Sequence, residues 1–190
     1  MADEVSRETP TKVVGVRRLK EAMAKPASTR IFTVANQKGG VGKTTTTVNI
    51  AAAMAMGGLR VLVIDLDPQG NASTALGVEH RDSAGVYEVL MGSAMMPEVI
   101  KKVSGFPELD CVSSNTSLAN AEINLVSMVA RELQLKAAID ELSANYDYIF
   151  IDCPPSLGLL TINAFAASKD RKSTRLNSSH LTQSRMPSSA

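Results

Sequence analysis

The chain has 190 residues, of which 44% are hydrophobic and only 4% aromatic, and its formal net charge is +1. This length and composition predict one compact domain with an aliphatic core, and they argue against an aromatic-rich binding sheet. The sequence has no run of 18 or more apolar residues and is charged where a signal peptide would be apolar, so we expect a cytoplasmic protein.

Charge divides the chain into three segments. Residues 1–30 carry seven Lys/Arg against four Asp/Glu and predict a flexible basic tail, with a DNA- or partner-binding arm as the alternative. Residues 31–169 carry nine against fourteen, so charge count alone indicates no polyanion-binding surface. Residues 170–190 lack periodicity, and "DRKSTRLNSSH" can be back-translated into a sequence that resembles a common sequencing-library adapter. We interpret this last segment as non-native or disordered, with the natural sequence expected to stop near Lys169.

From Ile31 onward, apolar runs typical of strands alternate with segments typical of helices. Strands are predicted at "IFTVA" (31–35), "RVLVIDLD" (60–67), "ELDCVSS" (108–114) and "YDYIFID" (146–152). Helices are predicted at 43–58, around 84–92, through 124–142 and after the turn that opens 153–168. The continuous run at 60–67 indicates a central strand. This alternation predicts an α/β fold with a parallel sheet and right-handed crossovers.

The stretch "ANQKGGVGKTTTTVNI" follows the first predicted strand and opens the first helix. Its glycines allow backbone N–H groups to surround phosphate oxygens at the start of the helix; they are Gly39, Gly40 and Gly42. Lys43 would neutralise the phosphates, and the Thr44 hydroxyl would ligate Mg²⁺. The stretch therefore predicts a nucleotide-phosphate site.

The same stretch departs from the usual pattern G-x-x-x-x-G-K-[ST]. Gln37 stands where the first glycine is expected, and a second lysine, Lys38, follows it at once. Lys38 is therefore either a surface lysine or a second phosphate-directed charge on the opposite flank of the loop.

Three aspartates follow predicted strands. Asp152 ends an apolar strand, where a carboxylate beside the phosphate loop would hold Mg²⁺, although a lone aspartate there usually caps the next turn. Asp65 and Asp67 are two residues apart and share one face of an extended backbone. One is expected in the metal shell, while the other orients or deprotonates the attacking water. The alternative for Asp67 is a turn formed with Pro68.

Three motifs in this order, "KGGVGKTT", "DLDPQGNAST" and "DCPPSLGLLTINA", resemble the ParA branch of the deviant Walker A ATPases, the chromosome and plasmid partition proteins also called Soj. The resemblance covers residues 31 to about 168 and defines residues 31–169 as the amino-terminal portion of such an ATPase domain. It implies a three-layer P-loop NTPase fold that is incomplete at its carboxyl end, because similar proteins continue well beyond the "TINA" helix.

The resemblance also implies roles for single residues. ATP phosphates would be bound by Lys38, Gly39, Gly40, Val41, Gly42, Lys43, Thr44 and Thr45. Lys38 would reach across a dimer to the partner's phosphates and act in catalysis with Lys43 and Asp67. Loss of Asp67 would stop hydrolysis but not ATP binding. Thr44, Asp65 and Asp152 would hold Mg²⁺, and Pro154 and Pro155 would stiffen the following switch.

For the whole protein, the resemblance implies an ATP-dependent homodimer that binds DNA without sequence preference. A ParB-type partner would stimulate ATP hydrolysis and so release the dimer from DNA. The protein would then be cytoplasmic and associated with the nucleoid. Most of the DNA-binding surface would lie beyond this chain. A membrane-associated division-site ATPase resembling MinD is an alternative, although "PQGN" after Asp67 favours the partition branch. An iron-protein relative would need cluster cysteines, and Cys153 has no suitable companion. A nonfunctional truncated fragment is a further alternative.

Overall fold

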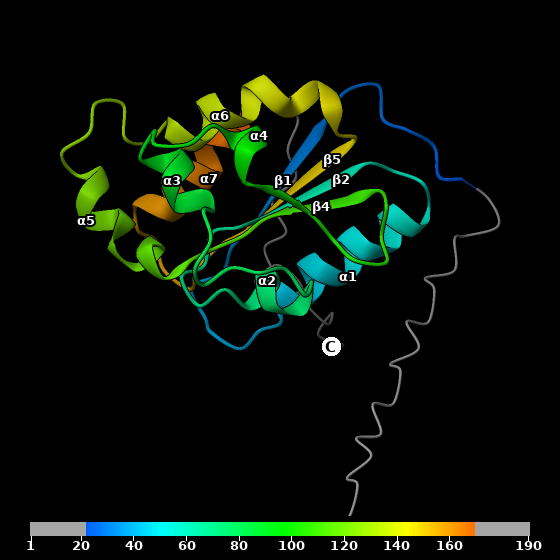
Figure 1. Ribbon diagram of the computed structural model, residues 1–190, viewed down its shortest axis with the longest axis horizontal. Helices are drawn as coiled ribbons and strands as arrows, with labels where there is room; N and C mark the ends of the chain where they lie inside the picture. Colours follow the sequence, from blue (N-terminus) through cyan, green and yellow to red (C-terminus); the bar gives the residue numbers. More distant parts are fainter. Residues whose placement is uncertain (1–21, 170–190) are drawn as a thin grey trace, which may run out of the picture.

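The computed structural model describes residues 22–169, which contain a five-stranded sheet in the order β1-β5-β2-β4-β3. The neighbours β1, β5, β2 and β4 can be followed in Figure 1. The strands are β1 (Arg30–Val34), β2 (Val61–Asp65), β3 (Ile100–Lys102), β4 (Leu109–Val112) and β5 (Tyr148–Asp152). The neighbouring pairs among β1, β5, β2 and β4 are parallel. The expected α/β fold is therefore confirmed.

Helices cover both faces of this sheet. They are α1 (Lys43–Met56), α2 (Asn71–Ala75), α3 (Val86–Leu90), α4 (Met96–Val99), α5 (Ala121–Leu125), α6 (Gln134–Leu142) and α7 (Leu159–Lys169), with 3₁₀ turns η1 (Thr116–Asn120) and η2 (Ser143–Asn145). In Figure 1, α1 and α2 lie on one side of the sheet, and α3, α4, α6 and α7 lie on the other. The result is the expected three-layer arrangement.

Strand β2 lies between β5 and β4, as the continuous apolar run predicts, and all five of its residues are buried. Alternate side chains point to opposite faces of a strand. Leu62 and Ile64 accordingly join the core under α3, α6 and α7, whereas Val61 and Val63 join the core under α1 and α2. Helix α1 meets that second core through small residues four apart, which are Thr47, Ala51 and Ala55.

Strand β3 was not expected, and it makes the sheet mixed because it pairs antiparallel with β4. The connection between the two strands is a short turn, in which Phe106 N–H bonds to Val103 O and Val103 N–H bonds to Leu109 O. A connection this short can join only antiparallel strands, since parallel neighbours need a long crossover.

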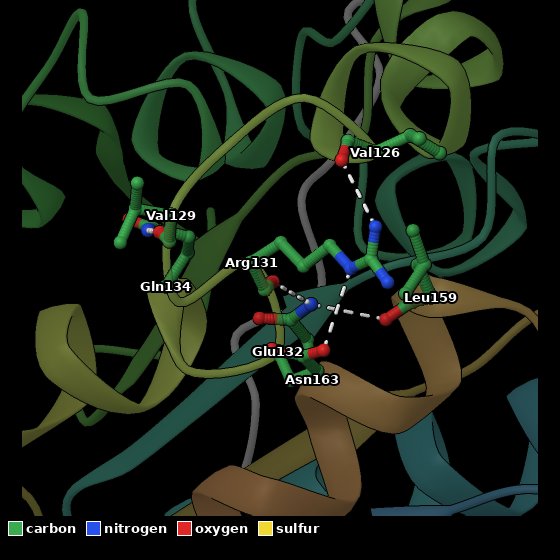
Figure 2. A network of polar contacts seen from close by, with 7 residues as sticks. All are labelled: Val126, Val129, Arg131, Glu132, Gln134, Leu159 and Asn163. Carbon is green, nitrogen blue, oxygen red and sulfur yellow. Dashed lines mark hydrogen bonds and ion pairs between the residues drawn. The ribbon is translucent and has the colours of Figure 1, made fainter.

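The single helix expected over residues 124–142 was wrong, because the chain leaves the helical path between α5 and α6. Ala130 has a positive φ of 52°. Figure 2 shows the Asn163 side chain reaching from α7 into this turn, where it donates to Arg131 O at 2.8 Å, and it also donates to Leu159 O within α7. Asn163 Oδ1 also accepts the N–H of Leu135 at 3.2 Å. The bonds to Arg131 and Leu135 thus occupy backbone groups just before and at the start of α6.

Residues 22–29, the described part of the expected basic tail, contact the domain. Met23 N–H bonds to Gly57 O at 2.9 Å, Thr29 Oγ1 donates to Tyr146 O, and Lys25 Nζ lies 3.9 Å from the buried carboxylate of Asp147. Residues 1–21 and the expected tail 170–190 lie outside the described residues. Within residues 22–169, the helices are too short or too polar to cross a bilayer.

Candidate functional site

A cavity of about 640 Å³ opens at the carboxyl edge of the sheet. Its lining is Gly39, Gly40, Val41, Gly42, Lys43, Thr44, Thr45, Val48, Asn49, Asp67, Gln69, Asn71, Ala75 and Pro155. These residues follow β1, β2 and β5, whose carboxyl ends meet because the strands are parallel. Ligands of open α/β sheets bind at this edge.

The glycine loop between β1 and α1 depends on two backbone conformations. Gly40 has φ 71° and Gly42 has φ 83°, which side chains with a Cβ rarely adopt. A Cβ at either position would meet nothing within 4 Å, so the backbone angle rather than space requires glycine. Gly42 immediately precedes α1, and its carbonyl accepts the N–H of Thr46. The positive end of a 14-residue helix thus faces the cavity.

Thr44 and Asp152 form the contact that joins the glycine loop to β5. Thr44 Oγ1 donates to Asp152 Oδ2 at 2.6 Å, and Thr47 Oγ1 lies 3.2 Å from Oδ1. Burial raises the pKa of Asp152 to about 6, against the hydrogen bonds from the two threonines. A hydroxyl and a carboxylate are the oxygen ligands that Mg²⁺ prefers, so the pair fits a metal ion.

Within residues 22–169, no three His, Cys, Asp or Glu side chains gather as a metal site. A cation beside Thr44 and Asp152 would therefore need further oxygens from a bound phosphate chain or water. Mg²⁺ commonly binds in this way, through one or two carboxylates and substrate phosphates.

Asp65 lies beside Asp152, because the two are register partners in β2 and β5. Its carboxylate is fully buried and outside the cavity lining. Oδ2 accepts the N–H and the hydroxyl of Ser73, both at 2.7 Å, and Oδ1 accepts the N–H of Asp67 at 3.3 Å. Burial raises the pKa of Asp65, although the Ser73 bonds oppose this. Its oxygens are thus directed at protein donors.

Asp67 and Lys38 differ in their position relative to the cavity. Asp67 lines the cavity, and its Oδ1 accepts the N–H of Gln69 at 3.0 Å in a local turn. Lys38 is exposed and outside the lining, and its backbone N–H bonds to Asn36 Oδ1. The structure therefore brings Asp67 together with the loop residues 39–45, while Lys38 lies outside that group.

Several lining residues were not singled out from the sequence. Gln69 and Asn71 belong to the motif that contains Asp67, so their positions after a buried strand were available as a signal. Val48 and Asn49 lie three and four residues after Thr45 on α1, and this spacing places them on the same face of the helix as Thr45. Pro155, which the resemblance had assigned to the switch after Asp152, follows β5 and also lines the cavity.

Comparisons with known proteins agree with this geometry. A family model described as an AAA domain matches residues 29–171. The sporulation initiation inhibitor protein Soj of Bacillus subtilis is 51% identical over 73% of this chain and 55% of that protein. The chromosome partitioning protein ParA of Myxococcus xanthus is 46% identical over 73% of this chain and 49% of that protein. The chain thus spans about half the length of these relatives.

Solved structures show the same fold. The cobyrinic acid a,c-diamide synthase of Mycobacterium smegmatis, with a bound ATP analog and magnesium, has a TM-score of 0.70 and 42% identity over 74% of this chain and 57% of that one. A plasmid partition protein of Borrelia burgdorferi has a TM-score of 0.67 and 29% identity over 74% of this chain and 62% of that one. The family match, the relatives and the glycine loop together show that this chain belongs to the AAA domain family, in the branch of the Soj and ParA partition proteins.

Proposed function

We propose that this chain is the ATP-binding and ATP-hydrolysing part of a DNA-partition protein. The observation that carries the proposal is the glycine loop whose Thr44 hydroxyl bonds to the strand-end carboxylate of Asp152 at 2.6 Å. The contact supports the proposal because it joins a helix terminus that would bind phosphate to an oxygen pair that would bind Mg²⁺. The two curated relatives above are a Soj and a ParA protein, which favours partition over the membrane-associated alternative.

ATP and Mg²⁺ would share this cavity. The phosphates would lie against the backbone N–H groups of residues 39–45 and the Lys43 ammonium, and Mg²⁺ would bind Thr44 and Asp152. Asp65, a predicted ligand, would add negative charge beside Asp152 while its oxygens stay with Ser73 and Asp67. Mg²⁺ neutralises charge on the transferred phosphoryl group.

Asp67 and Lys38 would both serve hydrolysis. Asp67 lines the cavity and would orient the attacking water through its carboxylate. Lys38 is exposed and would place its charge on the phosphates of a second copy, as an arginine finger does. The proposal thus includes an ATP-dependent homodimer.

The whole protein would have DNA and a ParB-type protein as its partners, and it would be associated with the nucleoid. Residues 31–169 carry fourteen acidic against nine basic side chains, so they offer little attraction for DNA phosphates. We therefore propose that residues 31–169 contribute little to DNA binding by the whole protein.

The Asp67→Ala variant tests the hydrolysis part of the proposal. We expect it to bind ATP with unchanged affinity, because the glycine loop and Thr44–Asp152 remain, while turnover falls by about a hundredfold as water is no longer oriented. Binding is measured with a fluorescent ATP analogue and turnover by phosphate release. The exposed Asp82→Ala variant is the matched control and should behave as wild type. Normal turnover in Asp67→Ala would overturn the role.

The Lys38→Ala variant tests the contact between copies. ATP binding by the monomer should persist, since Lys38 lies outside the cavity lining, whereas the ATP-dependent dimer should be lost. Light scattering with and without ATP measures the dimer fraction. Arg81→Ala removes another exposed positive charge and should leave that fraction unchanged. An unaltered dimer in Lys38→Ala contradicts the assignment.

A further inference from the structure

Asp65 and Ser73 close a seven-residue segment at the edge of the cavity. Asp65 ends β2, Ser73 lies in α2, and the Asp65 carboxylate accepts both the N–H and the hydroxyl of Ser73 at 2.7 Å. The segment between them, residues 66–72, contains Asp67, Gln69 and Asn71 of the cavity lining. The two ends of this segment are thus joined directly.

The Ser73 hydroxyl makes two contacts inside the protein. It donates to Asp65 Oδ2 and accepts the N–H of Ser114, just beyond β4, at 3.1 Å. Asp65, Ser73 and Ser114 all have zero exposure. Hydrogen bonds to an ionised carboxylate are roughly twice as strong as neutral ones, and a low local dielectric strengthens them further. Ser73 therefore fixes α2 to the ends of two strands.

Other hydrogen bonds of segment 66–72 either form its internal turn or hold its first residue. Gln69 N–H and Gly70 N–H both bond to Asp67, so these contacts shape the turn without fixing it to the sheet. Leu66 N–H bonds to Asp152 O and fixes the beginning of the segment. At its end, the contacts of Ser73 with Asp65 and Ser114 provide the corresponding attachment.

We propose that Ser73 is a positioning residue for the hydrolysis step, which holds Asp67 at a set place relative to Thr44 and Asp152. The inference rests on the proposed function. Ser73 is outside the cavity lining and acts through Asp65 and the segment 66–72. A misplacement of about 1 Å in a catalytic group can cost a hundredfold in rate, so a loosened segment slows turnover without weakening ATP binding.

The test compares Ser73→Ala with Ser114→Ala. Ser114 Oγ is buried and has no hydrogen-bond partner within residues 22–169, so its removal is a matched deletion of a buried hydroxyl. In Ser73→Ala we expect amide hydrogen exchange across residues 66–72 to rise at least about tenfold, because a charge-assisted bond is lost. Turnover should fall about tenfold with unchanged ATP affinity. Ser114→Ala should match wild type in all three measurements.

The outcomes separate this inference from the proposed function. Unchanged exchange in Ser73→Ala, or equal changes in both variants, overturns the positioning role. Wild-type protein that binds no ATP overturns the proposed function, while the exchange result still decides whether Ser73 fixes the segment. If Ser73→Ala does not fold, Asp65→Asn weakens the same two bonds by removing the charge, and wild-type exchange across 66–72 in that variant overturns the inference.

Discussion

Replacement of Lys43 by alanine is expected to weaken ATP binding by roughly a thousandfold. Lys43 opens α1 and lines the cavity beside the glycine loop. Removing one partner of a close charge pair in a partly buried site costs about 2–5 kcal/mol, and each 1.4 kcal/mol is a factor of about ten in affinity. The phosphates would also lose their only lysine within the cavity lining.

A fluorescent ATP analogue titrated into wild type and Lys43→Ala measures this loss. Lys136→Ala is the control, because Lys136 pairs with Asp140 at 2.7 Å on the surface of α6, away from the cavity lining. Such surface pairs contribute a few tenths of a kcal/mol, and the control should bind as wild type does. An affinity within a factor of two or so of wild type for Lys43→Ala would place the phosphates elsewhere.

The Asn163→Ala variant is expected to lose about 2–4 kcal/mol of unfolding free energy. Asn163 is fully buried on α7, and its amide bonds to Arg131 O, Leu159 O and Leu135 N–H. Alanine would leave the Arg131 carbonyl and the Leu135 N–H without these bonds, and an unpaired buried polar group costs about 1–3 kcal/mol. Figure 2 shows that this side chain joins α7 to the turn before α6.

Urea unfolding followed by circular dichroism measures this change, because the chain has no tryptophan to report on folding. Asn124→Ala is the matched control. Asn124 is exposed, and its amide donates to the Tyr87 hydroxyl at 2.9 Å, so the expected loss is below about 0.5 kcal/mol. Equal midpoints for the two variants would show that the Asn163 bonds do not stabilise the turn.

Local patterns were enough to predict the parallel strands and the glycine loop. The run around Val61–Asp65 is apolar on both faces, and only a central strand buries both. The break between α5 and α6 has no such local sign, since residues 124–142 contain neither glycine nor proline. The side chain that bonds to this break is Asn163, which is 28 residues from Leu135 in sequence. Propensity cannot detect a partner that arrives through tertiary packing.

In the candidate site, too, some features could be predicted from local sequence and others depend on tertiary packing. The glycines of the loop, Lys43, Thr44 and Asp67 were predicted from their positions after strands, Val41 and Thr45 followed from the resemblance, and all of them line the cavity. Spacing could not show that the Asp65 carboxylate is directed at Ser73, eight residues later, because this depends on how α2 folds back over β2. Alternation places Asp65 and Asp67 on one face in an extended chain, but the chain leaves the strand after Asp65.

The strand order determines how far the walls of the cavity lie from each other. The glycine loop follows β1, the Asp67 segment follows β2, and β5 lies between these two strands. Neighbouring strands are about 4.8 Å apart, so the glycine loop and the Asp67 segment leave the sheet about 10 Å from each other. Changes in loop sequence can alter the chemistry of this cavity while its span stays the same. Evolution could therefore vary the loops of this edge widely without rebuilding the dimensions of the site.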